Sequence, residues 1–154
     1  MTPFAWNGHS ITVRLDEHEA SLLARLPLLL AGVGLEADDA AAGRLYPAAY
    51  EEDEEADGEY RRLMTGELDR ARSEDRDVFA ETVRRGRYAI AVSDAEAWLR
   101  VIGDARLALA ARRGILEGSD EWEQLIRIDP DLALVAWLGH LQAVLVDALA
   151  DAMG

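Results

Sequence analysis

The chain has 154 residues, of which 50% are hydrophobic and 30% charged, a composition typical of a folded protein with one core. It contains no cysteine, which excludes disulfides, thiolate metal sites and thiol redox chemistry. The formal charge is -14 and all 16 basic residues are arginine, so a general basic face for nucleic acid is excluded.

The sequence predicts no targeting or membrane segment. The first ten residues lack the basic start and the apolar run of a signal peptide. The longest apolar run, Leu26 to Leu35, is too short to cross a bilayer. We therefore expect a single soluble, cytoplasmic domain over residues 1–154.

The first predicted element is a β-hairpin with Asn7-Gly8 as a two-residue turn, because both turn positions favour positive φ. Such a turn pairs Trp6 with His9 and Phe4 with Ile11. One face of the hairpin is then expected to pack on the core, with His9 at its rim as a packing residue rather than a catalyst. The residues of that face are Phe4, Trp6, His9, Ile11 and Val13.

A helix is predicted to follow, because Asp16 and Glu19 have the spacing of a capping box. Pro27 should kink this helix, since its ring removes a backbone donor and clashes with the preceding turn. Gly32 and Gly34 are expected to end it.

An acid-rich block, Glu51 to Glu59, carries seven acids and no base. Its spacing resembles a calcium loop, but Met64 stands where the twelfth position requires a bidentate carboxylate. We therefore predict no metal site, and interpret the acids as favourable charges before a helix. The helical pattern over residues 56–87 is too long for one straight helix in a compact domain, which predicts a kink or break near Ser73.

Residues 88–92, YAIAV, form a short apolar run that predicts a third strand, followed by a capping box of Ser93 and Glu96. A central helix is expected over about residues 94–114, with Gly114 as its stop. It is apolar around most of its circumference, which is typical of the centre of a bundle, and Leu107 points away from the main stripe. The stripe comprises Trp98, Ile102, Ala105 and Leu109, with Leu99, Val101 and Ala108 at its edges.

Arg106 falls within this apolar stripe, near Leu99 and Ile102. Its guanidinium is therefore expected to be at least partly buried, and a buried cation needs a carboxylate nearby.

The chain ends in two further predicted helices, a short amphipathic one at Ser119 to Ile128 and a long one that starts at Asp129-Pro130. His140 lies opposite the apolar stripe of the last helix and is expected to be exposed. The predicted fold is mainly α: an orthogonal helical bundle around the central helix, with a small N-terminal hairpin and a third short strand. The stripe of the last helix comprises Leu134, Leu138, Leu141, Leu145 and Leu149.

Motifs that carry chemistry are missing from the sequence. It has no G-x-S-x-G elbow, glycine-rich phosphate loop, H-E-x-x-H or E-x-x-H pattern, so no catalytic, cofactor-binding or metal-binding residue is predicted and the protein is not expected to be an enzyme. Arg84, Arg85 and Arg87 form the one dense basic cluster, which we interpret as a solvated helix end rather than a phosphate contact.

Three blocks in this order resemble a known family: RLYPAAYEEDEEADGEYRRL at residues 44–63, WLRVIGDARLALAARRGI at 98–115 and WLGHLQAVLVDAL at 137–149. The family is the actinobacterial domain of unknown function numbered two thousand and seventeen. The resemblance implies a gene neighbourhood shared with ClpS, the adaptor of the Clp protease, and some members are labelled transcriptional regulators. It implies no reaction.

The resemblance places the family's acid-rich turn at Asp53 to Glu59 and its Asp-x-Arg pair at Asp104 and Arg106. Gly103 stands where an asparagine is usual, and Ala110-Ala111 replace the more common Gly-Thr. Together with the burial argument, this predicts a structural ion pair between Arg106 and an acid of the block. The candidate residues are Arg106, Asp104, Asp53, Glu55 and Glu59.

The leading hypothesis is a non-catalytic regulatory or adaptor protein that acts through protein contacts, with the Clp adaptor or protease system as the partner implied by resemblance. The alternative is a transcriptional regulator that uses the Arg84 to Arg87 cluster. A small-molecule binder or enzyme is the third class. The broad apolar surface of the central helix leaves room for a homodimer.

Overall fold

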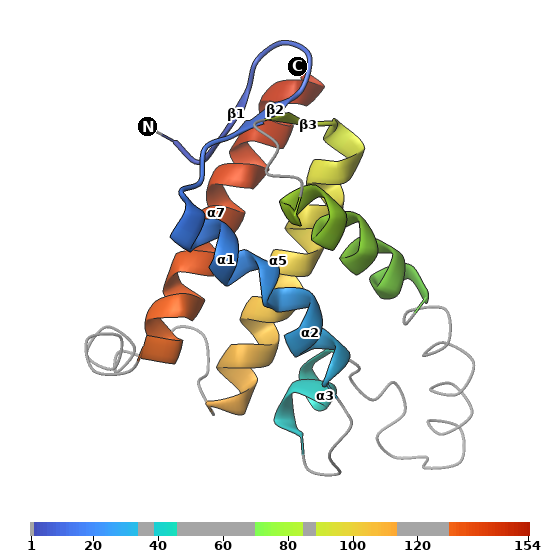
Figure 1. The fold of residues 1–154 in the computed structure, drawn as a ribbon, viewed down its shortest axis with the longest axis vertical. Coiled ribbons are helices and arrows are strands. Elements are labelled where there is room, and N and C mark those ends of the chain that lie inside the picture. Colours follow the sequence, from blue (N-terminus) through green and yellow to red (C-terminus); the bar gives the residue numbers. More distant parts are fainter. Residues whose placement is uncertain (1, 34–38, 46–69, 85–88, 114–129) are drawn as a thin grey trace.

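The computed structural model describes residues 2–33, 39–45, 70–84, 89–113 and 130–154. Within them the fold is mainly α, with one small antiparallel sheet near the N-terminus, as the sequence predicts. Helices α5 (Val92–Arg112) and α7 (Pro130–Met153) lie side by side and form the core of the fold (Figure 1).

The sheet has the order β1-β2-β3, with β1 at Phe4–Trp6, β2 at Ile11–Val13 and β3 at Ala89–Ile90. The predicted third strand is confirmed, because β3 pairs antiparallel with β2 and places Ile90 opposite Ile11. The predicted hairpin register is wrong by two residues, since Phe4 pairs with Val13 and Trp6 with Ile11.

The turn explains the shifted register. The Asn7 side chain accepts hydrogen bonds from the His9 and Ser10 backbone amides at 2.9 and 2.8 Å, and Asn7 N donates to Ser10 O at 3.1 Å. The loop is therefore longer than two residues, with only Gly8 at positive φ. A shift of two preserves the faces, so the predicted strand residues still face the core, but His9 lies exposed in the turn instead of at the core rim.

Helix α1 (Glu17–Ala24) begins with the predicted capping box. Asp16 Oδ1 accepts from Glu19 N at 2.7 Å, and Glu19 Oε1 accepts from Asp16 N at 3.1 Å. Pro27 produces a break rather than a kink, because a separate helix, α2 (Leu26–Ala31), begins after Arg25 with the proline in its first turn. Gly32 caps α2 as expected.

Helix α5 starts earlier than predicted. Its N-cap is Ala91, which makes no side-chain capping bond, and Ser93 lies inside the first turn. The helix ends at Arg112, two residues before the expected stop at Gly114, which lies outside the described residues. The predicted apolar face is confirmed, and its buried residues are Trp98, Val101, Ile102, Ala105 and Ala108.

Residues 70–84 form one helix, so the predicted break near Ser73 is wrong. The break was predicted for a helix that starts at residue 56, and the residues before residue 70 lie outside the described residues. This helix packs against α5 through Phe79, whose ring lies 5.0 Å from that of Trp98 at 63°. Thr82 Oγ1 accepts a hydrogen bond from Trp98 Nε1 at 2.6 Å.

Helix α3 (Ala40–Leu45) packs on the C-terminal half of α5 and is held there by Asp39. The Asp39 carboxylate accepts from Arg112 at 3.1 and 2.9 Å, and it also accepts from Ala41 N at 3.0 Å. One carboxylate therefore both fixes the start of α3 and joins it to α5.

Helix α7 is long and apolar enough, by length and composition, to span a membrane, so Leu26 to Leu35 is not the longest apolar segment of the chain. Within the described residues, 39% of this apolar window is buried, where α7 packs on α5 and β1. His140 is exposed as predicted. The buried leucines of α7 include four of the five predicted, Leu138, Leu141, Leu145 and Leu149, while Leu134 is half-buried.

Candidate functional site

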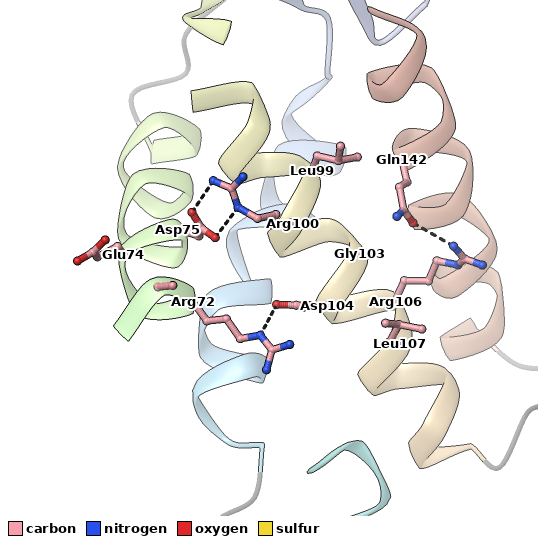
Figure 2. A pocket seen from close by; sticks show the side chains of 11 residues that line it. Arg72, Glu74, Asp75, Leu99, Arg100, Gly103, Asp104, Arg106, Leu107 and Gln142 are labelled. Atoms are coloured by element: carbon pink, nitrogen blue, oxygen red, sulfur yellow. Dashed lines mark hydrogen bonds and ion pairs between the residues drawn. The ribbon is translucent and has the colours of Figure 1, made fainter. Parts of the chain in front are cut away.

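A groove with a volume of about 690 Å³ runs along α5, between the helix of residues 70–84 on one side and α7 on the other. Figure 2 shows it from the side on which α1 and α2 lie behind α5. Helix α5 forms the floor with Leu99, Arg100, Gly103, Asp104, Arg106 and Leu107; the helix of residues 70–84 contributes Ala71, Arg72, Glu74 and Asp75; and α7 contributes Gln142.

The helical repeat explains why α5 can serve both the core and the groove. At about 100° per residue, the groove residues occupy one arc of about 160°, from Arg106 through Leu99 and Gly103 to Asp104. The buried residues, centred on Ala105, occupy the opposite arc. Leu107, which the sequence already placed away from the main stripe, belongs to the groove arc and is half-buried.

Two ion pairs join the floor of the groove to the helix of residues 70–84. Arg100 Nε and Nη2 donate to the two carboxylate oxygens of Asp75 at 2.7 and 2.9 Å, which is a bidentate pair. Arg72 Nε lies 3.1 Å from Asp104 Oδ2. Because the lower-numbered residue of one helix meets the higher-numbered residue of the other, the two pairs fix an antiparallel register.

The other side of the groove is formed by Arg106 and Gln142. Arg106 Nη1 donates to Gln142 Oε1 at 3.0 Å, and the side chain passes over Gly139 of α7. A Cβ atom at Gly139 would lie 3.4 Å from Arg106 Nε, so the glycine leaves room for the guanidinium. Figure 2 shows Arg106 and Asp104 projecting to opposite sides of α5.

The charges in the groove balance locally although the chain as a whole is acidic. The lining contains three arginines and three acids, whereas the formal net charge of the chain is -14. Burial raises the pKa of Asp104, and the nearby carboxylate of Asp75 raises it further, while Arg72 opposes both effects. The hydrogen bond to Asp75 raises the pKa of Arg100.

The structure tests part of the predicted ion-pair site. Arg106 is half-buried as predicted, and its hydrogen bond within the described residues is to the neutral amide of Gln142. The predicted partners Asp53, Glu55 and Glu59 lie outside the described residues, so their pairing with Arg106 stays a prediction. Asp104 pairs with Arg72.

Sequence reasoning missed Arg72, Asp75, Arg100 and Gln142. A signal was present, since residues 72–77, RSEDRD, are polar on every side of their helix and carry both charges. The complementary pattern is Arg100 and Asp104, one turn apart on α5. Either pattern alone describes a solvated helix face, and only the packing of the two helices shows that they meet.

The described lining of the groove combines ion pairs, a side-chain amide and apolar residues. Arg100 bonds Asp75 and Arg72 pairs with Asp104, while Glu74 lies exposed at the edge and Arg106 donates to Gln142. These features define a mainly helical protein with a charge-balanced groove along its central helix.

The model of one protein family, described as Domain of unknown function (DUF2017), matches residues 1–149. The chain therefore belongs to this family, as the three sequence blocks predict. No curated protein and no solved structure matches the chain.

Proposed function

We propose that this protein is a non-catalytic regulatory or adaptor protein, and that it binds another protein at the groove along α5. The observation that carries this proposal is the groove itself: about 690 Å³ of open space with leucines at its floor and paired charges at its edge. Protein interfaces have the same organisation, with an apolar centre surrounded by polar groups.

A protein segment fits this groove better than a small charged ligand does. The Arg100 guanidinium already makes two hydrogen bonds to Asp75, and Arg72 is paired with Asp104. A small anion would find the charges of both arginines already balanced by carboxylates, so it would gain little from either of them. A polypeptide can place an apolar side chain against Leu99 and Leu107 and leave both pairs intact.

The first partner to test is the Clp system, namely the adaptor ClpS and the Clp protease subunits, because the family resemblance suggests it. The proposal of a protein-binding groove does not depend on this particular partner. It rests on the shape and the charge pairing of the groove.

Site-specific photocrosslinking tests the proposal. A photoreactive amino acid replaces Leu107 in the groove, and in a matched control it replaces Leu28, which is 81% exposed on α2. Each protein is irradiated with purified ClpS and Clp subunits, and then in cells of the native host. We expect one discrete crosslinked protein from position 107, absent at position 28 and competed by unlabelled protein. No crosslink at 107, or the same products at both positions, would contradict the proposed function.

A further inference from the structure

The two sides of the groove differ in charge. The helix of residues 70–84 contributes two acids, Glu74 and Asp75, and one cation, Arg72, and Glu74 is exposed at the edge. The opposite side, toward α7, carries Arg106 and the neutral Gln142. A segment that lies in the groove therefore meets carboxylates on one side.

These carboxylates lie close to one another, although Arg72 and Arg76 offset part of their repulsion. Arg100 lies in the field of three acids, Asp75, Glu96 and Asp104, and is itself 56% exposed. Asp75 and Asp104 also act on each other, which is unfavourable when both are ionised and mostly withdrawn from water. An additional cation on this side would reduce that repulsion.

We propose that the occupant of the groove is a basic, amphipathic segment of a partner protein. It places an apolar side chain against Leu99 and Leu107, and an arginine or lysine beside Glu74 and Asp75. This inference rests on the proposed function, since it specifies the partner's chemistry at the same groove.

Charge complementarity favours this occupant over two others. The net charge of -14 attracts cationic segments at long range and opposes the approach of a second copy of the chain. An acidic segment would meet Glu74 directly, and it would find the charge of Arg100 already balanced by Asp75. The basic segment gains from both the overall field and the local carboxylates.

The experiment selects binders from a random heptapeptide library on the full-length protein and measures the affinity of synthetic winners by fluorescence anisotropy. We expect winners that combine arginine or lysine with a large apolar residue. Replacing the basic residue by glutamate, or the apolar residue by serine, should weaken binding by about tenfold or more. Raising the salt concentration should weaken it further.

Two charge-reversal variants separate local recognition from bulk attraction. Glu74→Arg changes the groove, whereas Asp147→Arg makes the same change in net charge at an exposed position of α7 that does not line it. Glu74→Arg should weaken binding about fivefold to tenfold, while Asp147→Arg leaves it nearly unchanged. Equal loss in both variants, winners without a basic residue, or self-association in place of peptide binding would overturn the inference.

The proposed function can survive that result. If peptides bind the groove and compete with the crosslink at Leu107 but show no preference for basic residues, the docking site stands and only the partner's chemistry is wrong. If no crosslink forms at Leu107, the docking function itself fails.

Discussion

The indole of Trp98 is expected to fix the helix of residues 70–84, and with it the acidic side of the groove. Trp98 is 2% exposed, and its Nε1 donates to Thr82 Oγ1 at 2.6 Å. Its ring packs between Phe79 at 5.0 Å and Phe4 at 6.0 Å. Apart from these contacts, the two ion pairs of Arg72 and Arg100 join the same helix to α5.

The magnitude follows from the two interactions that Trp98→Phe removes. Loss of the hydrogen bond costs about 1 kcal/mol, since Thr82 keeps its own bond to Val78 O at 2.7 Å. The unfilled space left by the smaller ring adds roughly 1 kcal/mol. Thr82→Val removes the acceptor and leaves the buried indole N–H without its partner, which costs about 1–3 kcal/mol.

A double-mutant cycle measures the coupling. Urea unfolding followed by circular dichroism gives the unfolding free energies of the wild type, both single variants and the double variant. We expect the double variant to lose about 1 kcal/mol less than the sum of the single losses, because the bond can be removed only once. Additivity within about 0.3 kcal/mol would refute the claim that this bond joins the two helices.

Three further predictions concern the pH dependence, the floor and the edge of the fold. Because burial raises the pKa of Asp104 above 3.8, the wild type loses the stabilising contribution of the protonated carboxyl as the pH rises through the raised pKa. The unfolding free energy of Asp104→Asn, measured relative to the wild type, should therefore increase from pH 3.8 upward. A difference between the two proteins that does not change with pH would contradict this. Gly103→Ala should raise the unfolding free energy by about 0.5–1 kcal/mol, since its Cβ would lie 3.1 Å from only the flexible end of Gln142; a lower melting temperature would show that Gln142 cannot move. Asp39→Ala should lower the unfolding free energy by about 2 kcal/mol, and Asp39→Asn should lower it by less, because only the alanine removes the capping acceptor of Ala41 N. Equal losses for the two variants in denaturant titrations would assign the effect to the pair with Arg112 alone.

Local rules predicted the features that depend on neighbours in sequence. The Asp16 and Glu19 capping box and the apolar face around Trp98 are present, because each is set by residues within a few positions of one another. Pro27 interrupts the helix as expected, although by a break and not by the predicted kink. The third strand at Ala89–Ile90 was also predictable, since a short apolar run before a helix has few other uses in a compact domain.

The errors arose where several local solutions satisfy the same pattern. A two-residue turn and the observed longer loop both place Phe4 and Val13 on the core face, so hydrophobic patterning could not distinguish the two registers. The Asn7 side chain decided between them by accepting from the amides of His9 and Ser10. Ser93 is not the N-cap of α5, because the helix begins soon after β3, at Val92, with Ala91 as its N-cap.

The groove depends on distances that sequence patterns do not contain. Arg106 was identified as a half-buried cation from its place in the apolar stripe, but its contact with Gln142 requires the packing of α5 on α7. The same holds for Arg72 with Asp104 and for Arg100 with Asp75, which are 32 and 25 residues apart (104 − 72 and 100 − 75).

The exposure of these two pairs bears on their role. The Arg100 side chain is 56% exposed, so its pair with Asp75 contributes only about 0–1 kcal/mol to folding, whereas Arg72 and Asp104 are more buried, at 22% and 21% exposed. Buried residues such as Ile102 and Leu138 therefore supply most of the stability between α5 and its neighbours. The two ion pairs instead fix the positions of their carboxylates and guanidiniums along the groove. Substitution of Asp75 should consequently weaken the peptide binding proposed for the groove more than it lowers the unfolding free energy, and the reverse order would give this pair a structural role.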